Sequence, residues 1–416
     1  MSTVFNTFSG YTTQPLTVEV ITPLGREVGL IGNYEELTMN VSIKDADILD
    51  LVLPMDGLAV LLSQCDGSVL VSVKLEDKTF LFMPTEATAE SVDGAPDVAH
   101  LHITCSGGWT LLDGQAIPPS LEDPVEHALS TEFQLAGTLE QVTKRLITAG
   151  TLRLNHPIYV LTSQDRGPQV EVSGAWDSTA ELVRDLLNGT GYFLQLQGWV
   201  PGDPFPTGLA SPYGPAMVVD VVPFRNRETL WTTQAGDITK WSLSRTRPMA
   251  TRVTLGHETD TLENRTYYRV TDGNHAVGWH HRELYQEFKY DYPLWADKDV
   301  PPDHWRLLDQ MEVEAKRKLA EAGSKVSLSA EVDVANLWRF SQDRDDPRAF
   351  DLGDLITVEV PYLGRHRAVV TDVEVKATAD TFSVVPSIST PDTMSGDVFT
   401  RVSDLSRRVH NLERKK

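Results

Sequence analysis

Short apolar runs separated by polar breaks dominate residues 16–124. The runs at 18–21, 36–43, 68–75 and 100–107 are rich in Val, Leu and Thr, and Pro, Gly or Asp residues separate them. They have the length and composition of β-strands, and many in close succession are typical of a barrel or sandwich. We therefore predict an N-terminal arm at 1–16 and a first small β-barrel or sandwich domain at 17–125, with 216–235 as a candidate completing segment.

Helical spacing first appears after this region. Thr138 with Gln141, and Ser178 with Glu181, have the spacing of helix caps ahead of apolar residues that recur at helical intervals. An apolar strand follows each helix. Two such helix–strand units predict an inserted α/β module at 126–215, which ends in a loop rich in Pro and Gly.

Strand-like alternation resumes beyond this loop and is interrupted once. Residues 250–258 and 326–332 alternate between apolar and polar positions. Between them runs one helical stripe, formed by Leu308, Met311, Ala315, Leu319 and Ala322. We predict a second β-barrel domain from 236–275 and 325–390, with a helical, aromatic-rich insert at 276–324. The expected fold class is mainly β with α+β inserts.

The C-terminal residues carry a heptad pattern. Apolar side chains recur at spacings of four and three, at Val398, Val402, Leu405, Val409 and Leu412. This seam predicts a short coiled-coil helix at 395–416 that serves oligomerisation. About two heptads are too short to associate alone, so the coil needs an oligomer already assembled beside it. The alternative is an amphipathic helix packed on its own chain.

Charge is the most unusual feature of the composition. Lys and Arg number 37 against 59 Asp and Glu, and the net charge of −22 disfavours nonspecific attraction to nucleic acid or anionic lipid. The excess serves solubility or, around a channel for DNA, keeps phosphates from adhering. The chain has no membrane-spanning apolar run and no signal-peptide pattern, so we expect assembly in the cytoplasm and no membrane span. Cys65 and Cys105 are expected to be reduced and buried.

The stretch GWHHRELYQE at 278–287 concentrates imidazoles and carboxylates. A helix would place His280, Glu283 and Glu287 on one face, but the two-His spacing of helical zinc sites is absent. Aromatic residues surround the stretch, which favours packing or a contact surface over chemistry. The candidate interface residues are Trp279, His280, His281 and Tyr285. A glycan or protein contact and a metal site are the alternatives.

Catalytic signatures are absent from the sequence. The chain has no G-x-S-x-G, H-E-x-x-H, Walker or G-x-G-x-x-G motif. The carboxylates at 343–346 are interleaved with arginine, which is more typical of a solvated turn than of a glycosidase pair. We predict no enzymatic activity, no catalytic residues, no cofactor and no bound metal.

Three stretches resemble one known family. LTVEVITPLGREVGLIGNYEELTMNVSIKDADILDLVLP at 16–54 is similar to the first strands of the tail-tip or baseplate hub proteins of long-tailed bacteriophages. DITKWSLSRTRPMATRVTLGHE at 237–258 is similar to the family's N-R-V-x-V-x-G approach to its second barrel, with Thr251 in place of Asn. FDLGDLITVEVPYLGRHRAVVTDVEVKATADTFSVVPSI at 350–388 is similar to its closing G-D-x-V-x-V hairpin unit.

The resemblance implies a structural protein of the virion, in the phage tail, that assembles in the host cytoplasm. Such hubs are homotrimers whose paired β-domains form a pseudo-sixfold ring between a hexameric tail tube and a threefold tip, and this ring lines or closes the DNA channel. The implied partners are a distal tail or tube-end ring protein, the tape-measure protein and downstream tip or receptor-binding proteins, with DNA only in passage. Because Val at a and Leu at d more often favour dimers, the hub would have to impose the trimer on the coil.

Two other functions remain open. A carbohydrate-binding tail adhesin would use the nine Trp residues and the loop at 200–215, and would bind a glycan as an isolated chain. A tail-associated cell-wall hydrolase would need a further domain, whereas only a linker and the predicted coil follow Ile388.

Overall fold

A computed structural model describes residues 16–92, 95–121, 132–206, 212–257, 265–272, 279, 281–288, 304–323, 325–332, 338–343, 345–362 and 364–389. Strands make up 51% of the structure and helices 17%, so the predicted mainly β class is confirmed. The described residues divide into two compact units. The first draws on Met1–Trp241 and Ser329–Pro391, and the second on Ser242–Leu328.

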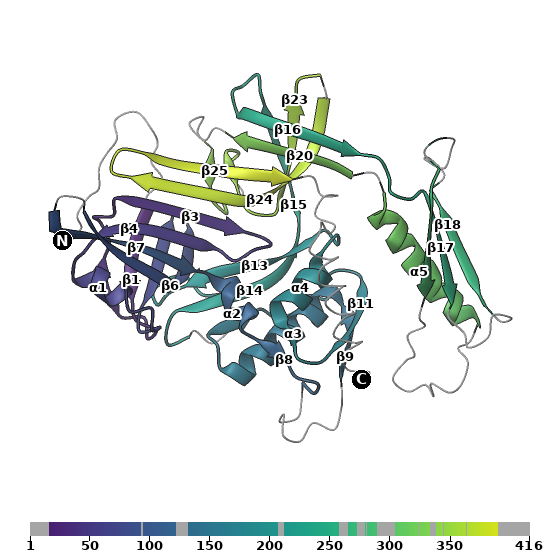
Figure 1. The fold of residues 1–416 in the computed structure, drawn as a ribbon, viewed down its shortest axis with the longest axis horizontal. Helices are drawn as coiled ribbons and strands as arrows, with labels where there is room; N and C mark the ends of the chain where they lie inside the picture. Colours follow the sequence, from purple (N-terminus) through teal and green to yellow (C-terminus); the bar gives the residue numbers. More distant parts are fainter. Residues whose placement is uncertain are drawn as a thin grey trace. The chain divides into compact units, whose positions relative to one another are not determined.

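One large sheet dominates the first unit (Figure 1). Its thirteen strands are β1 (Leu16–Ile21), β2 (Glu27–Leu30), β3 (Glu36–Ser42), β4 (Ile48–Pro54), β5 (Leu70–Leu75), β6 (Lys78–Val92), β7 (Ala95–Ser106), β15 (Arg225–Thr232), β16 (Ile238–Thr246), β20 (Lys325–Val332), β23 (Asp354–Val360), β24 (Gly364–Thr378) and β25 (Phe382–Ser389). The order is β16-β20-β25-β24-β3-β4-β7-β6-β5-β1-β2, and β23 pairs with both β15 and β24. The chain leaves the first unit along β16 and returns along β20.

The long strand β24 joins the early and late β-regions. Its first part pairs with β23, and its second part pairs with β3 over Asp372↔Ser42 to Thr378↔Glu36. Buried side chains such as Met39 and Val375 lie at this seam. We expected two separate β-barrel domains; instead, strands of both regions share one sheet, whose order over the described strands does not close. Alternation in the sequence locates strands, but it does not tell which strands pair across most of the chain.

Small elements flank this sheet. Helix α1 (Gly57–Leu62) follows β4, and Asp56 Oδ1 caps it by accepting hydrogen bonds of 2.9 Å from the backbone N–H groups of Leu58 and Ala59. Helix α2 (Gly108–Asp113) follows β7. The short strands β21 (Arg339–Phe340) and β22 (Ala349–Phe350) pair in parallel.

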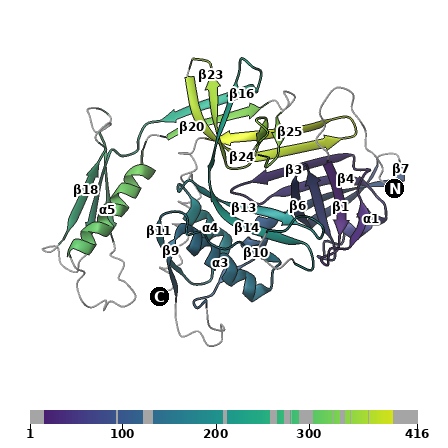
Figure 2. The ribbon, with the colours of Figure 1, turned by 180° about the vertical axis from the view of Figure 1, so that it is seen from behind.

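The inserted α/β module also belongs to the first unit. Its helices are α3 (Leu139–Leu154) and α4 (Thr179–Leu187), and its strands are β8 (Ala116–Ile117), β9 (Phe133–Thr138), β10 (Ile158–Val160), β11 (Gln169–Gly174), β12 (Asp177–Ser178), β13 (Tyr192–Trp199) and β14 (Ala216–Pro223). Figure 2 shows α3 and α4 beside each other, next to β13 and β14. The predicted caps are confirmed, because Thr138 and Gln141 form a capping box and Ser178 accepts from the N–H of Glu181.

Residues 216–235 do not complete the first β-domain as we expected. Strand β14 pairs with β13 and, in parallel, with β10, so it belongs to the α/β module. Strand β15 pairs in parallel with β23. The sequence gives no sign of this, because a parallel partner lies far away along the chain.

In the described residues of the second unit, a three-stranded sheet is covered by one helix. Strands β17 (Arg252–His257), β18 (Tyr267–Thr271) and β19 (Glu283–Phe288) lie in the order β18-β17-β19, and α5 (His304–Glu321) packs on one face. Its core contains Val253, Leu255, Leu307, Met311 and Ala315. The stripe is thus confirmed, except that Leu307 is buried and Leu308 is only half-buried.

Two expectations for this region are corrected. Residues 283–288 form a strand rather than the helix considered for 279–287, since they extend the sheet parallel to β17. Strand β17 packs against α5 in the second unit, whereas we expected it in the second β-domain.

In the described part of the chain, no helix combines the length and the apolar character needed to cross a membrane. Both cysteines are free; Cys105 is buried and Cys65 half-buried.

Candidate functional site

A small cavity in the first unit lies where several distant segments of the chain meet. Residues of β3 and its following loop, the start of β6, strand β13 and the segment 340–352 line it. Its volume is about 40 Å³. That is room for a few ordered waters, and far below the volume of about 300 Å³ at which small-molecule pockets begin. We therefore regard this place as a structural junction between segments.

A cluster of charged side chains holds the junction together. Lys78 Nζ lies 2.6 Å from Asp351 Oδ1, and Arg225 Nη2 donates to Asp351 Oδ2 at 2.9 Å. Arg227 Nε donates to Asp354 Oδ2 at 2.8 Å, and Arg225 Nε lies 3.3 Å from Asp354 Oδ1. Lys78, Asp351 and Asp354 are buried. Burial raises the pKa of Asp354, while Arg225 opposes that shift.

The G-D pair of the predicted closing motif lies in this cluster. Gly353 has a φ of 77°, and a Cβ there would overlap the ring of Phe193. The next residue, Asp354, accepts a hydrogen bond of 2.8 Å from the backbone N–H of Asp351 and so stabilises the turn between the two residues. The motif therefore places two carboxylates against the arginines of β15, which is a role in assembling the fold.

Asp47 is a further buried carboxyl group in the wall of the cavity. Its Oδ1 accepts a hydrogen bond of 3.0 Å from the backbone N–H of Ser42. Burial raises its pKa to about 7, and the nearby charge of Asp372 adds to the shift. Asp47 is therefore the group of the junction that titrates near neutral pH.

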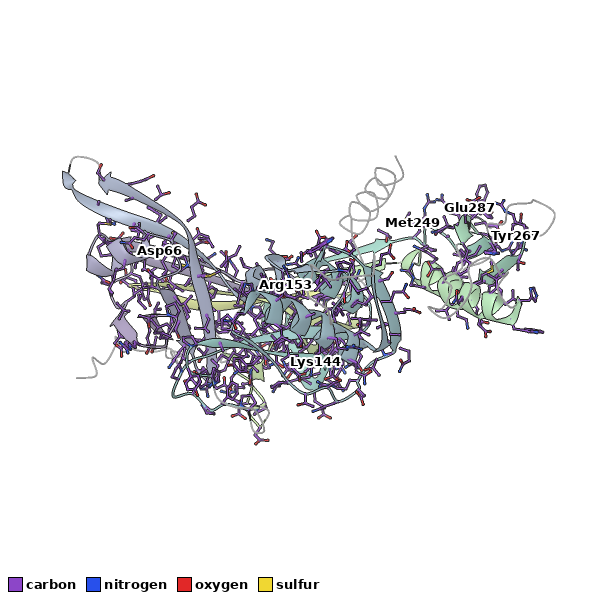
Figure 3. The ribbon with its side chains drawn as sticks, turned by 90° about the horizontal axis from the view of Figure 1, so that it is seen from below. Asp66, Lys144, Arg153, Met249, Tyr267 and Glu287 are labelled. Atoms are coloured by element: carbon purple, nitrogen blue, oxygen red, sulfur yellow. The ribbon has the colours of Figure 1, made fainter. Side chains whose placement is uncertain are left out.

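A second charge network braces the α/β module. Glu140 on α3 is fully buried; it bonds Lys144 Nζ at 2.6 Å and Arg166 Nη2 at 2.8 Å. Asp220 on β14 contacts the same two cations at 2.6 and 2.7 Å. Two anions and two cations thus close a balanced cluster that ties the loop before β11 to α3. Lys144 is labelled in Figure 3.

The predicted interface residues are not gathered into a metal or catalytic site. Trp279 is 98% exposed, and Tyr285 lies half-exposed on β19. His281 Nδ1 is 3.0 Å from Thr251 Oγ1. His280 lies outside the described residues. Within the described ranges, no group of three His, Cys, Asp or Glu side chains has the arrangement of a metal site.

The potential ligands Glu283 and Glu287 have other partners. Glu283 Oε1 accepts a hydrogen bond of 2.6 Å from Thr254, which lowers the pKa of that carboxyl group. Glu287 Oε1 accepts one of 2.8 Å from Arg265. Both carboxylates therefore belong to the surface of the sheet.

The predicted coiled-coil residues Val398, Val402, Leu405, Val409 and Leu412 also lie outside the described residues. Sequence reasoning missed Lys78, Arg225, Arg227 and Asp351 as a group. The one available signal was the G-D motif, since a strand that opens with Asp after Gly predicts a turn whose carboxylate needs a donor.

A family model described as Siphovirus ReqiPepy6 Gp37-like protein matches residues 17–388. The tail protein from Neisseria meningitidis MC58 has a TM-score of 0.51 and 13% identity, over 90% of this chain and 96% of that chain. The prophage MuSo2 43 kDa tail protein from Shewanella oneidensis has a TM-score of 0.50 and 12% identity, over 92% of this chain and 98% of that chain.

A third solved structure is similar to the same extent. The prophage tail protein gp18 from Listeria monocytogenes EGD-e has a TM-score of 0.51 and 10% identity, over 94% of this chain and 98% of that chain. At such identities, the similarity establishes a shared fold. No curated protein matches the chain.

Proposed function

Because the chain belongs to the Siphovirus ReqiPepy6 Gp37-like protein family, a family of phage tail proteins, we propose that it is the structural hub of a tail tip. The predicted resemblance to tail-tip and baseplate proteins is confirmed, and so is the predicted place in the virion. In the proposed role, three copies form a ring that joins the hexameric end of the tail tube to the threefold tip and lines or closes the DNA channel.

One observation carries this proposal. Strand β24 pairs with β3, so the β-regions near the two ends of the chain form a single scaffold. The chain as a whole matches three tail proteins, two of them from prophages, over 96% to 98% of their length. A shared sheet supports a hub, because a ring needs rigid subunits that do not open along their own seams.

The proposed partners follow from this position. They are the distal tail or tube-end ring protein, the tape-measure protein and downstream tip or receptor-binding proteins. DNA passes without being held, and the net charge of −22 supports passage over binding. The heptad residues at 398–412 would form a short coiled coil along the threefold axis once the ring has brought three copies together.

We propose a structural role without enzymatic activity. The junction cavity is too small for an organic substrate, and its charged residues are paired with one another. The carbohydrate-binding adhesin stays a second candidate because several aromatic side chains are exposed on the described surface, including Trp279 and Tyr213.

Light scattering of the purified chain tests the hub. We expect a particle of three times the 46.2 kDa chain mass, both for the full chain and for a chain that lacks residues 397–416. A trimer lost on truncation would shift oligomerisation to the coil. A stable monomer in both forms would contradict assembly by the β-scaffold and would favour the adhesin.

A further inference from the structure

A glycine in the second unit lies between two exposed tyrosines. Gly256, on the central strand β17, is in register with Tyr267 on β18, and Tyr285 on β19 is in register with Thr254. A Cβ at Gly256 would be 2.5 Å from Tyr285 Oη and 3.1 Å from Tyr267 Cε1. Both phenol rings therefore reach over the bare backbone of the glycine.

This arrangement lies on the open face of the sheet. Val253 and Leu255 pack against α5, so the alternate residues Thr254 and Gly256 face the other way. Figure 3 shows Tyr267 and Glu287 on the side of the sheet opposite α5. Tyr267 is 55% exposed and Tyr285 is 48% exposed. About half of the surface of each residue is thus accessible to a ligand.

Hydrogen bonds order the polar groups around the rings. Arg265 bonds both Tyr267 and Glu287, and these bonds raise the pKa of Arg265. Glu283 accepts from Thr254, and Arg269 Nε donates to the same hydroxyl at 3.3 Å. The carboxylates and guanidinium groups are therefore already matched with one another, and a charged ligand would have to separate them.

The glycine on this face lowers the stability of the sheet. Glycine in a central strand costs about 0.5 to 1 kcal/mol relative to alanine, and it often marks a close approach by a ligand. Aromatic rings have negatively polarised faces, on which the C–H groups of a sugar ring can rest while its hydroxyls reach a polar rim. We propose that Gly256, Tyr267 and Tyr285 form a binding site for a neutral oligosaccharide, with Glu283, Glu287 and Arg265 as the hydrogen-bonding rim.

A neutral sugar fits this face better than the other common ligands of exposed aromatics. Nucleic acid is disfavoured by the acidic chain, and an anionic or cationic ligand by the internal pairing of the rim. All residues of the site come from the second unit of a single chain, so the site needs no residue from another copy. Chain mass and sugar binding therefore test the hub and this site separately.

The test starts with the full chain on an array of neutral β-glucan, chitin and galactan oligosaccharides. Titration calorimetry with the best-binding oligosaccharide then compares variants. We expect Tyr267→Ala with Tyr285→Ala to weaken binding at least about tenfold, since two stacking surfaces are lost. Tyr267→Phe with Tyr285→Phe keeps both ring faces and should retain most of the affinity.

Two matched control variants each lack one fully exposed tyrosine that lies outside the proposed site. Tyr213→Ala and Tyr362→Ala remove such rings from the first unit, and both should bind like the unchanged chain. Thermal unfolding of each variant establishes that loss of binding is not loss of folding, and the phenylalanine pair serves if the alanine pair unfolds. The proposal is overturned if no array sugar binds, if the alanine pair binds normally, or if the array signal disappears with Tyr213 or Tyr362.

Discussion

Lys78 Nζ lies 2.6 Å from Asp351 Oδ1, although β6 and the segment before β23 come from opposite ends of the chain. Both groups are buried, and Lys78 also lies 4.6 Å above the ring of Phe340. The pair therefore links the early and late β-regions of the first unit, which β24 also joins by strand pairing. A hub that holds its shape at the tail tip needs this kind of long-range closure.

Removing the lysine should destabilise the first unit strongly. Lys78→Met leaves the buried Asp351 with Arg225 as its remaining ion-pair partner, and breaking a buried pair typically costs about 3 to 5 kcal/mol. The free energy of unfolding from urea titration of the full chain measures this cost. Lys376→Met removes the exposed pair with Glu374 and should change it by less than about 1 kcal/mol. Equal effects of the two variants would rule out the proposed closure.

Asp47 should make the first unit less stable as the solution approaches neutral pH. Its pKa is raised from 3.8 to about 7 in the folded chain, so folding favours the protonated form. That contribution is complete below pH 3.8 and is lost as the pH rises through 7. Asp47→Asn keeps the acceptor for Ser42 without the charge, and should be more stable than the unchanged chain by up to about 4 kcal/mol at pH 8. A stability difference between the two chains that stays constant from pH 5 to pH 8 would contradict the assignment.

Glu140 should make the chain less stable as the solution becomes acidic, which is the reverse of the pH dependence from Asp47. Although burial opposes it, hydrogen bonds from Arg166 and Lys144 lower the pKa of Glu140 from 4.5 to about 2. Its contribution is complete above pH 4.5 and is lost as the pH falls through 2. Glu140→Gln should therefore destabilise the chain by about 3 to 5 kcal/mol at neutral pH and by progressively less below pH 4.5. Urea titrations at several pH values measure the difference, and a cost that persists unchanged in acid would refute the network.

Met311 should be important for the second unit alone. It is fully buried between α5 and the sheet, so Met311→Ala leaves a cavity that costs about 2 to 5 kcal/mol. Hydrogen exchange should speed up in β17 and stay unchanged in β4. Val313→Ala, on the exposed side of the same helix, is the matched control and should leave both strands unchanged. Faster exchange in β4 as well would show that the two units unfold together.

The sequence predicted local structure better than long-range arrangement. Caps at Thr138 and Ser178 were read correctly because their partners lie three residues away. The join of β24 with β3 and the parallel pairing of β15 with β23 could not be predicted, because alternation carries no information about distant partners. Residues 283–288 form a strand since β17 supplies a hydrogen-bonding edge, and a local pattern of His and Glu gives no sign of that edge.

For the candidate sites too, local features could be predicted from the sequence and long-range contacts could not. Trp279 and Tyr285 were expected at a surface, and both are exposed, whereas their role as an interface stays a prediction. The ion pairs of Lys78 and Arg225 were missed because their partners follow in the chain only after more than a hundred residues. The proposed role of Gly256 could not be inferred from the sequence, because only the structure places Tyr267 and Tyr285 on either side of it.

Electron microscopy of the purified oligomer tests the central claim most directly. Class averages should show threefold symmetry, a pseudo-sixfold outline and an open or plugged central channel. Isolated single chains, or an assembly without a central axis for DNA, would contradict the hub.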